Sequence, residues 1–369
     1  MKKVLVANIF GIGDVLFTTP LISNLKNSIQ GVTVDYLCNA RTKDVVGMNP
    51  DVDDVFVYEK DEFLGLWKSS KVEWFESARD LFSGIRKKRY DIVFDFTLSR
   101  EFGLFFALSG IPCRIGLDYK KRGIFLTRKV PLTGFEDRHV VEYYLDLLDG
   151  LDVPKEKKDM RLVPEESSVE WASGYLKDKG ADGESVAAVI PGGGASWGTH
   201  AARKRWTPEG FAKASDILIR HGVKVAIFGD SSETELCREV SRQMSESPVA
   251  VDNSLTLKQY NALLSRVDLA LCNDGGPLHM AVALGVKTVS IFGPVDEKVY
   301  GPYPVSDKHR VITALEMPCR PCYGRFKLPE CDNDIRCLTD IEPERVANVC
   351  LELLGKPRSS ELKAPSSEK

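Results

Sequence analysis

The sequence predicts an α/β protein built from two doubly wound, mostly parallel sheets. Short apolar runs alternate with amphipathic stretches along most of the 369 residues, and this β-α-β-α order is typical of parallel sheets. Two of the apolar runs, residues 4–7 and 267–272, lead into glycines and a carboxylate. Because ligands of open α/β sheets bind at the carboxyl ends of strands, these two distant segments predict two domains that face one cleft.

Length and composition indicate a globular protein of ordinary make-up. The apolar fraction is 43%, the charged fraction is 28% and the net charge is −3. A general nucleic-acid binder would be strongly basic, so nucleic acid is not an expected partner. No apolar run reaches the ~18 residues of a membrane span, and the N-terminus enters a strand pattern where a signal peptide would continue its apolar region. We therefore expect a cytoplasmic protein.

The first domain is expected to cover residues 1–165. Apolar runs predict strands at residues 4–7, 32–37, 54–58 and 91–96. Apolar residues at helical spacing predict helices over residues 15–28 and 63–88. Residues 153–166 are rich in Pro, Lys and Glu and have little apolar periodicity, so we expect the linker there.

The second domain, residues 166–355, repeats the alternation. Strands are expected at residues 186–190, 223–228, 249–251, 269–272 and 288–292. Helices are expected at residues 208–221, 257–266 and 342–354. The remaining tail, residues 356–369, has the Ser-, Lys-, Glu- and Pro-rich composition of a disordered segment.

The first strand is followed by Gly-Ile-Gly-Asp at residues 11–14. This motif resembles the opening of a dinucleotide fingerprint, but Leu16 stands where the third glycine belongs, and Asp35 falls inside the next strand. An NAD-dependent oxidoreductase is therefore disfavoured. The two glycines make a tight turn that presents Asp14 at the start of a helix. Asp14 can accept a proton from a hydroxyl group or can simply cap the helix, and the motif alone leaves both open.

Two glycine-containing loops follow strands of the second domain, at residues 191–196 and 273–279. Backbone N–H groups of such loops, and of a helix that follows, can hold a phosphate. The cations at residues 203–205 favour a diphosphate, although a solvated basic patch is the alternative. The residues expected to receive this ligand are Gly192, Gly193, Ser196, Lys204, Asp274, Gly275, Gly276 and His279.

Taken in order, these motifs resemble those of the family 9 glycosyltransferases, the ADP-heptose:lipopolysaccharide heptosyltransferases, and especially the heptosyltransferase II branch. The resemblance extends from residue 1 to residue 354. It rests on residues 11–16 with Pro20, 191–192, 204–208, and 273–281 followed by 292–294. It implies a GT-B fold, in which two Rossmann-like domains bind the acceptor and the nucleotide-sugar respectively.

The resemblance implies an inverting enzyme that moves a heptose from ADP-heptose to a lipopolysaccharide inner-core acceptor and needs no cofactor or bound metal. Asp14 matches the catalytic base, and Lys204 matches a lysine that contacts the donor phosphates. Glu233 corresponds to an acidic residue that binds the donor ribose or base. Without a metal, cations and helix N-termini must stabilise the charge on the leaving diphosphate.

A phosphorylated, membrane-bound acceptor would be attracted to basic runs of the first domain. The residues expected to bind it are Gly13, Lys120, Lys121 and Arg122. The run at residues 86–89 is expected to be ordinary solubilising charge.

The apolar run at residues 63–67, with Trp74 and Phe75, is expected to be the core face of a helix; contact with a bilayer is the alternative. Because the acceptor would be membrane-bound, peripheral contact of the protein with the cytoplasmic face of the inner membrane is a further expectation.

The nine cysteines fall into two groups. Five are scattered through apolar contexts and are expected to be small buried hydrophobic residues: Cys38, Cys113, Cys237, Cys272 and Cys350. Four cluster near the C-terminus and have a spacing compatible with a structural zinc site: Cys319, Cys322, Cys331 and Cys337. Plain thiols are the alternative. Four thiolates would leave zinc no open position, so the ion would staple a loop and not catalyse.

Two other functions fit the same residues. A family 9 transferase could use another nucleotide-sugar or another glycan acceptor. A non-catalytic nucleotide-sugar-binding protein on the same fold would bind the donor without turnover and would not need Asp14. The presence of Asp14 at the matching position weighs against this second alternative.

Overall fold

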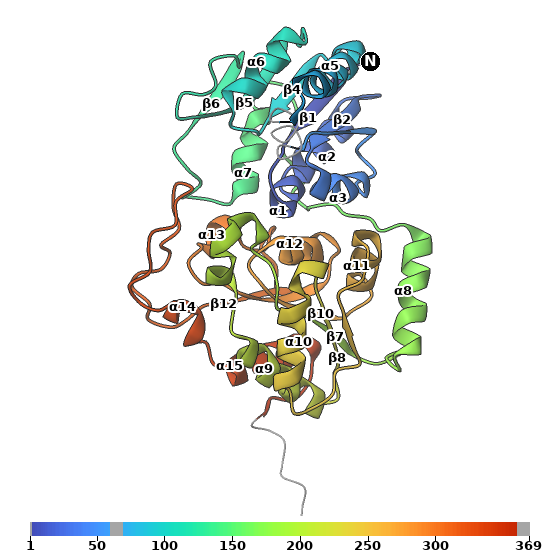
Figure 1. Cartoon of the computed structure of the whole chain (residues 1–369), viewed down its shortest axis with the longest axis vertical. Helices are drawn as coiled ribbons and strands as arrows, with labels where there is room; N and C mark the ends of the chain where they lie inside the picture. The colour runs from blue at the N-terminus through green and yellow to red at the C-terminus, as the bar shows by residue number, and fades with distance from the viewer. Residues whose placement is uncertain (1, 60–68, 360–369) are drawn as a thin grey trace, which may run out of the picture. The chain divides into compact units, whose positions relative to one another are not determined.

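The computed structural model describes residues 2–59 and 69–359, without the side chains of residues 74, 75, 195 and 196. The chain divides into two compact units, Met1–Val163 and Pro164–Lys369, called here the N-terminal and the C-terminal unit (Figure 1). The apolar run at residues 63–67, the side chains of Trp74 and Phe75, and residues 360–369 of the tail lie outside the described part. None of the described helices has the length and apolar composition that crossing a membrane requires.

The N-terminal unit has a parallel sheet with the strand order β3-β2-β1-β4-β5-β6. Its strands are β1 (Lys3–Ala7), β2 (Thr33–Cys38), β3 (Asp54–Val57), β4 (Ile92–Asp95), β5 (Cys113–Tyr119) and β6 (Arg128–Leu132). The first four are the strands that the apolar runs predict. The order reverses between β1 and β4, and ligands of doubly wound sheets bind at the carboxyl ends of strands at such a point.

Helices cover both faces of this sheet. They are α1 (Ile12–Leu16), α2 (Thr19–Ser28), α3 (Lys43–Gly47), α5 (Lys71–Lys88), α6 (Arg100–Leu108) and α7 (Val140–Leu145), with 3-10 segments η1 (Ala40–Thr42) and η2 (Asp146–Leu148). The single helix expected over residues 15–28 is two helices. Pro20 lies in the first turn of α2, where its missing N–H costs nothing, and Thr18 separates the two by bonding back to the Val15 carbonyl at 2.6 Å.

The segment expected to be a linker is an extended strap that is bonded to the N-terminal unit. The side chain of Asn24 donates to the Lys157 carbonyl at 2.8 Å and accepts from the Lys157 N–H at 3.0 Å. The N–H of Arg161 donates to Thr19 Oγ1 at 2.9 Å. Polar groups of α2 thus satisfy a backbone that has no helix or sheet partner.

The C-terminal unit has a second parallel sheet, in the order β12-β11-β10-β7-β8-β9. Its strands are β7 (Val186–Ile190), β8 (Lys224–Phe228), β9 (Ala250–Asp252), β10 (Leu269–Asn273), β11 (Lys287–Ile291) and β12 (His309–Ile312). Only β12 lacks a counterpart among the expected strands. Its sequence, His-Arg-Val-Ile, is too polar to form an apolar run, because it lies at the edge of the sheet.

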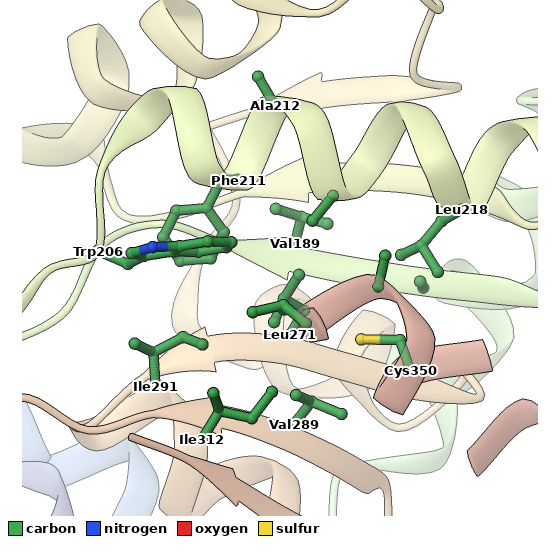
Figure 2. Packing of buried hydrophobic residues seen from close by; sticks show 14 of the residues in the cluster. Val189, Trp206, Phe211, Ala212, Leu218, Leu271, Val289, Ile291, Ile312 and Cys350 are labelled. Atoms are coloured by element: carbon green, nitrogen blue, oxygen red, sulfur yellow. The ribbon is translucent and has the colours of Figure 1, made fainter. Parts of the chain in front are cut away.

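Helices of this unit are α8 (Glu166–Asp178), α9 (Pro208–Arg220), α10 (Thr234–Gln243), α11 (Leu257–Leu264), α12 (Gly276–Ala283), α13 (Glu297–Tyr300), α14 (Arg336–Thr339) and α15 (Pro343–Leu354), with 3-10 segments η3 (Ala195–Lys204) and η4 (Ser231–Glu233). Figure 2 shows Phe211 and Leu218 of α9 directed at sheet residues such as Val189 and Leu271. Trp206 is 1% exposed, and its ring centroid lies 5.1 Å from that of Phe211. Burying one such large apolar side chain contributes about 1.5–3 kcal/mol to the free energy of folding. This core therefore holds the strands whose carboxyl ends carry the loops of the C-terminal unit.

A buried carboxyl group lies at the carboxyl end of β4, beside β1. Asp95 is 5% exposed, and its Oδ1 accepts hydrogen bonds from Thr97 N at 2.9 Å and Thr97 Oγ1 at 2.6 Å. Burial disfavours the charged form more than these bonds favour it, and raises the pKa of Asp95 to about 6.

We expect Asp95→Asn to change how stability depends on pH. The folded state binds this proton more tightly than the unfolded state, so the contribution of Asp95 to stability is complete below pH 3.8 and is lost as pH rises to about 6. The difference in pKa corresponds to about 3 kcal/mol. Urea unfolding at pH 4 and 7 should show wild type losing up to this amount relative to Asp95→Asn. The exposed Asp159→Asn is the control, and equal pH profiles for wild type and Asp95→Asn would contradict the expectation.

Candidate functional site

The two glycine loops of the C-terminal unit meet at one edge of its sheet. The first glycine loop (residues 191–194) follows β7 and the second (residues 274–276) follows β10, and these parallel strands are neighbours. The loops touch: a Cβ added to Gly275 would lie 3.4 Å from the backbone nitrogen of Gly194. The backbone at Gly193 has φ of +103°, which side chains other than glycine rarely permit. The sequence-predicted loops are thus brought together.

Lys204 and Asp274 form a buried ion pair beside these loops. Lys204 Nζ lies 2.6 Å from Asp274 Oδ2, and the two side chains are 10% and 4% exposed. The same ammonium lies 4.6 Å from the ring centroid of Trp197, which belongs to η3. A buried charge needs a close partner, and here the partner is another predicted site residue.

The N-terminus of α12 points at the same edge. This eight-residue helix begins at Gly276, after Asp274 and Gly275 have followed the end of β10, and has no acidic residue in its first turn. His279 lies in that turn and is 3% exposed. Ser196 belongs to η3, while its side chain lies outside the described part. Helix N-termini attract anions, so α12 brings a partial positive charge to the edge that holds the Lys204–Asp274 ion pair.

Glu233 lies under the first glycine loop. It is 5% exposed, and its Oε1 accepts from the Gly193 N–H at 2.6 Å while its Oε2 accepts from the Asp230 N–H at 3.2 Å. Arg205 donates from Nε to the Gly193 carbonyl at 2.8 Å and lies 3.5 Å from the Glu233 carboxylate. A Cβ at Gly192 would collide with this carboxylate. Glu233 therefore supports the first glycine loop, and its contact with a ribose or base stays a prediction.

Asp14 lies at the carboxyl end of β1 in the N-terminal unit. Its Oδ2 accepts from the Gly11 N–H at 3.1 Å, and Asn8 donates to its backbone carbonyl at 3.0 Å. The side chain is partly exposed. Its role as a helix cap is thus visible, and its role as a proton acceptor stays a prediction.

Lys120, Lys121 and Arg122 lie directly after β5, and Gly13 lies in α1. Because β1, β4 and β5 are adjacent and parallel, this basic turn and Asp14 lie at the same edge of the N-terminal sheet. Lys120 and Lys121 both have positive φ, 52° and 59°, a conformation that is strained for residues with a Cβ. Strained backbone of this kind is often found at functional sites.

Asp35 and Lys88 of the N-terminal unit are paired with each other inside the fold. Asp35, the residue that a dinucleotide site would use, is 1% exposed; it accepts from the Tyr90 hydroxyl at 2.6 Å and lies 3.1 Å from Lys88 Nζ. These contacts bury it in the core, which agrees with the rejection of an NAD site. The other three cations of residues 86–89 line an open hollow of about 730 Å³.

The four clustered cysteines line one small cavity of about 20 Å³. Cys319 is exposed and Cys337 is buried, and all nine cysteines are free. Across the described residues, no group of three or more His, Cys, Asp and Glu side chains is placed to hold a metal ion, so a zinc staple stays a prediction. Of the five scattered cysteines, four are buried, and Cys113, the first residue of β5, is partly exposed.

Sequence reasoning did not single out Asn273 or Trp197, and it treated Arg205 only as one of the cations at residues 203–205. Asn273 hydrogen-bonds to the first glycine loop and to Trp206. Trp197 stacks on Tyr323 with ring centroids 4.9 Å apart. Asn273 and Arg205 stand inside quoted motifs, but only the fold shows what each one touches.

The fold and these loops define a protein of two Rossmann-like α/β units, the second of which has two touching glycine loops, the Lys204–Asp274 ion pair and a helix N-terminus at one edge of its sheet. Residues 78–331 match the family model of glycosyltransferase family 9 (heptosyltransferase). The chain therefore belongs to this family.

Similar curated proteins include lipooligosaccharide heptosyltransferase 2 of Campylobacter jejuni, 27% identical over 59% of this chain and 65% of that protein. The chain thus matches slightly less than two thirds of that relative's length. Lipopolysaccharide heptosyltransferase 2 of Salmonella typhimurium is 25% identical over 96% of this chain and 99% of that protein.

Solved structures show the same fold. ADP-heptose lipopolysaccharide heptosyltransferase II of E. coli has a TM-score of 0.73 at 22% identity, over 96% of this chain and 98% of that one. E. coli heptosyltransferase WaaC with ADP has a TM-score of 0.71 at 17% identity, over 95% and 99%. The expected α/β, GT-B fold class is confirmed.

Proposed function

We propose that this protein is an inverting, metal-independent glycosyltransferase that moves a heptose from ADP-heptose to a lipopolysaccharide inner-core acceptor. The observation that carries the proposal is that two glycine loops, Lys204 and the N-terminus of α12 lie together at one edge of the sheet of the C-terminal unit. These groups suit a diphosphate. Family membership and the similarity to heptosyltransferases, one of them solved with ADP, support heptose as the sugar and ADP as the carrier.

On the donor side, the chemistry requires stabilisation of the leaving group. As the bond between the heptose anomeric carbon and the diphosphate oxygen breaks, negative charge grows on ADP. Lys204 would exchange its ion pair with Asp274 for contact with the phosphates. N–H groups of the glycine loops and of α12 would hold the same oxygens.

On the acceptor side, the proposed base is Asp14. The acceptor hydroxyl oxygen would form the new bond to the anomeric carbon from the face opposite ADP, which inverts its configuration. The hydroxyl proton would pass to the Asp14 carboxylate. The cap from Gly11 holds that carboxylate in one orientation before the substrate arrives.

The acceptor itself is proposed to be a phosphorylated glycolipid. Lys120, Lys121 and Arg122 lie at the same sheet edge as Asp14 and would attract its phosphates. A lipid-anchored acceptor would bring the protein to the cytoplasmic face of the inner membrane as a peripheral partner.

In this reaction cations and backbone dipoles take the part that a metal plays in other transferases. A zinc ion held by Cys319, Cys322, Cys331 and Cys337 would leave no open position for substrate. It would instead stabilise the loop that is bonded to the Pro294 carbonyl through the N–H groups of Cys322 and Tyr323, both at 3.0 Å.

A mass-spectrometric transfer assay tests the proposal. Purified protein is given a truncated core glycolipid and, in separate reactions, ADP-heptose, ADP-glucose, UDP-glucose or GDP-mannose, each with and without EDTA. The expected result is one heptose added from ADP-heptose alone, at the same rate with chelator. Transfer from another donor would reassign the sugar. Saturable ADP binding with no transfer from any donor would favour a non-catalytic nucleotide-sugar-binding protein.

A further inference from the structure

The side chain of Asn273 holds both ends of the segment that carries Lys204. This residue ends β10 and is 1% exposed. Its Nδ2 donates to the carbonyls of Pro191 at 2.8 Å and Gly192 at 3.1 Å. Its Oδ1 accepts from the Trp206 N–H at 2.8 Å. One amide group thereby fixes the chain just before and just after residues 193–205.

The position of Asn273 explains why a side chain is needed there. The parallel ladder between β7 and β10 ends at the pairing of Ile190 with Cys272. The residue that follows β7 is Pro191, which has no N–H with which to continue the ladder. The Asn273 side chain instead donates to the Pro191 carbonyl, which lies beyond the last pair of the ladder. Because it both donates and accepts, it also captures the N–H of Trp206, where η3 has ended and α9 is about to begin.

We propose that Asn273 is a positioning residue, which presets the first glycine loop and Lys204 for the donor diphosphate without touching the donor. Residues 193–205 form the segment between Gly192 and Trp206, and Asn273 hydrogen-bonds to both of these flanking residues. Glu233 and Arg205 hold the first glycine loop at Gly193. Fixing these ends in advance removes freedom that a flexible loop would lose on binding, so affinity for the diphosphate rises. This inference rests on the proposed function.

The variant Asn273→Asp removes the hydrogen bonds that the side chain donates and keeps the one that it accepts. The carboxylate has nearly the same shape and can still accept from Trp206, but it cannot donate to the carbonyls of Pro191 and Gly192. We expect the dissociation constant of ADP to rise at least about tenfold, equivalent to about 1.4 kcal/mol. Hydrogen exchange should become faster in residues 193–205 than in the rest of the unit.

Asn261→Asp is the matched control. Asn261 is also a fully buried asparagine of this unit, and its Nδ2 donates to the Leu257 carbonyl at 3.0 Å within α11. The control should lower the melting temperature and leave the dissociation constant of ADP within about twofold of wild type. The measurement is titration calorimetry with ADP, below the melting temperature of each variant.

The outcomes separate this inference from the proposed function. If wild type binds no ADP, the proposed donor fails. If wild type binds ADP and Asn273→Asp binds it equally well, Asn273 is merely structural and the inference is overturned. Should Asn273→Asp not fold, Asn273→Ser carries the same test, because its smaller hydroxyl cannot bridge all three backbone groups.

Discussion

Asp14→Asn is expected to lower the rate of heptose transfer by about 10²–10⁴-fold, the range that a positioned general base contributes, while ADP binding stays unchanged. An asparagine oxygen can still accept from the Gly11 N–H, so the start of α1 keeps its cap. The amide cannot take up the proton of the acceptor hydroxyl. Catalysis is therefore lost without loss of the local structure.

Single-turnover transfer, with ADP titration in parallel, measures this effect. Asp44→Asn is the matched control, because Asp44 is also an acidic residue in the first turn of a short helix of the N-terminal unit. The control should retain the wild-type rate. A rate for Asp14→Asn within twofold of wild type would show that the carboxylate only caps α1.

Lys204→Met is expected to weaken ADP binding by about 10–100-fold, because a hydrogen bond to a charged group contributes about 1.5–3 kcal/mol. It also leaves Asp274 as an unpaired charge in a site where that side chain is only 4% exposed. Removing one partner of a buried pair typically costs about 3–5 kcal/mol of stability. In Lys204→Met alone, a loss of ADP affinity could therefore result either from the lost phosphate contact or from the lower stability of the fold.

The double variant Lys204→Met/Asp274→Asn resolves this. It should recover much of the lost stability, because no buried charge remains, but it should not recover ADP affinity. Calorimetry gives the affinity and urea unfolding gives the stability. Lys213→Met, which removes an exposed lysine paired with Glu209, should change neither. Full recovery of ADP affinity in the double variant would show that Lys204 serves only to neutralise Asp274.

Most of the strands that the sequence predicted are apolar runs inside a sheet, and the partly exposed edge strands β3 and β9 were predicted as well. β1, β7 and β10 are almost wholly buried between helices, so they are continuous apolar runs. β5, β6 and β12 lie at or next to a sheet edge, have partly exposed residues and include Arg, Lys or His. Their sequences do not distinguish them from loops, and only pairing with a neighbouring strand defines them.

The glycine loops were predictable because their signal is local: glycines follow an apolar run. What organises those loops is not local. Asn273 reaches Pro191, and Glu233 reaches Gly193, across long stretches of sequence. A buried amide or carboxylate has many possible partners, and its partner depends on which strands become neighbours. The sequence therefore predicted the glycine loops themselves but not the side chains that hold them in place.

A crystal structure with bound ADP tests the donor site most directly. The expected result is a diphosphate within hydrogen-bond distance of Lys204 Nζ and of N–H groups in both glycine loops, with the Asn273 contacts unchanged. ADP bound away from these loops, with Lys204 still paired to Asp274 and remote from the phosphates, would contradict the proposed donor site and the mechanism that depends on it.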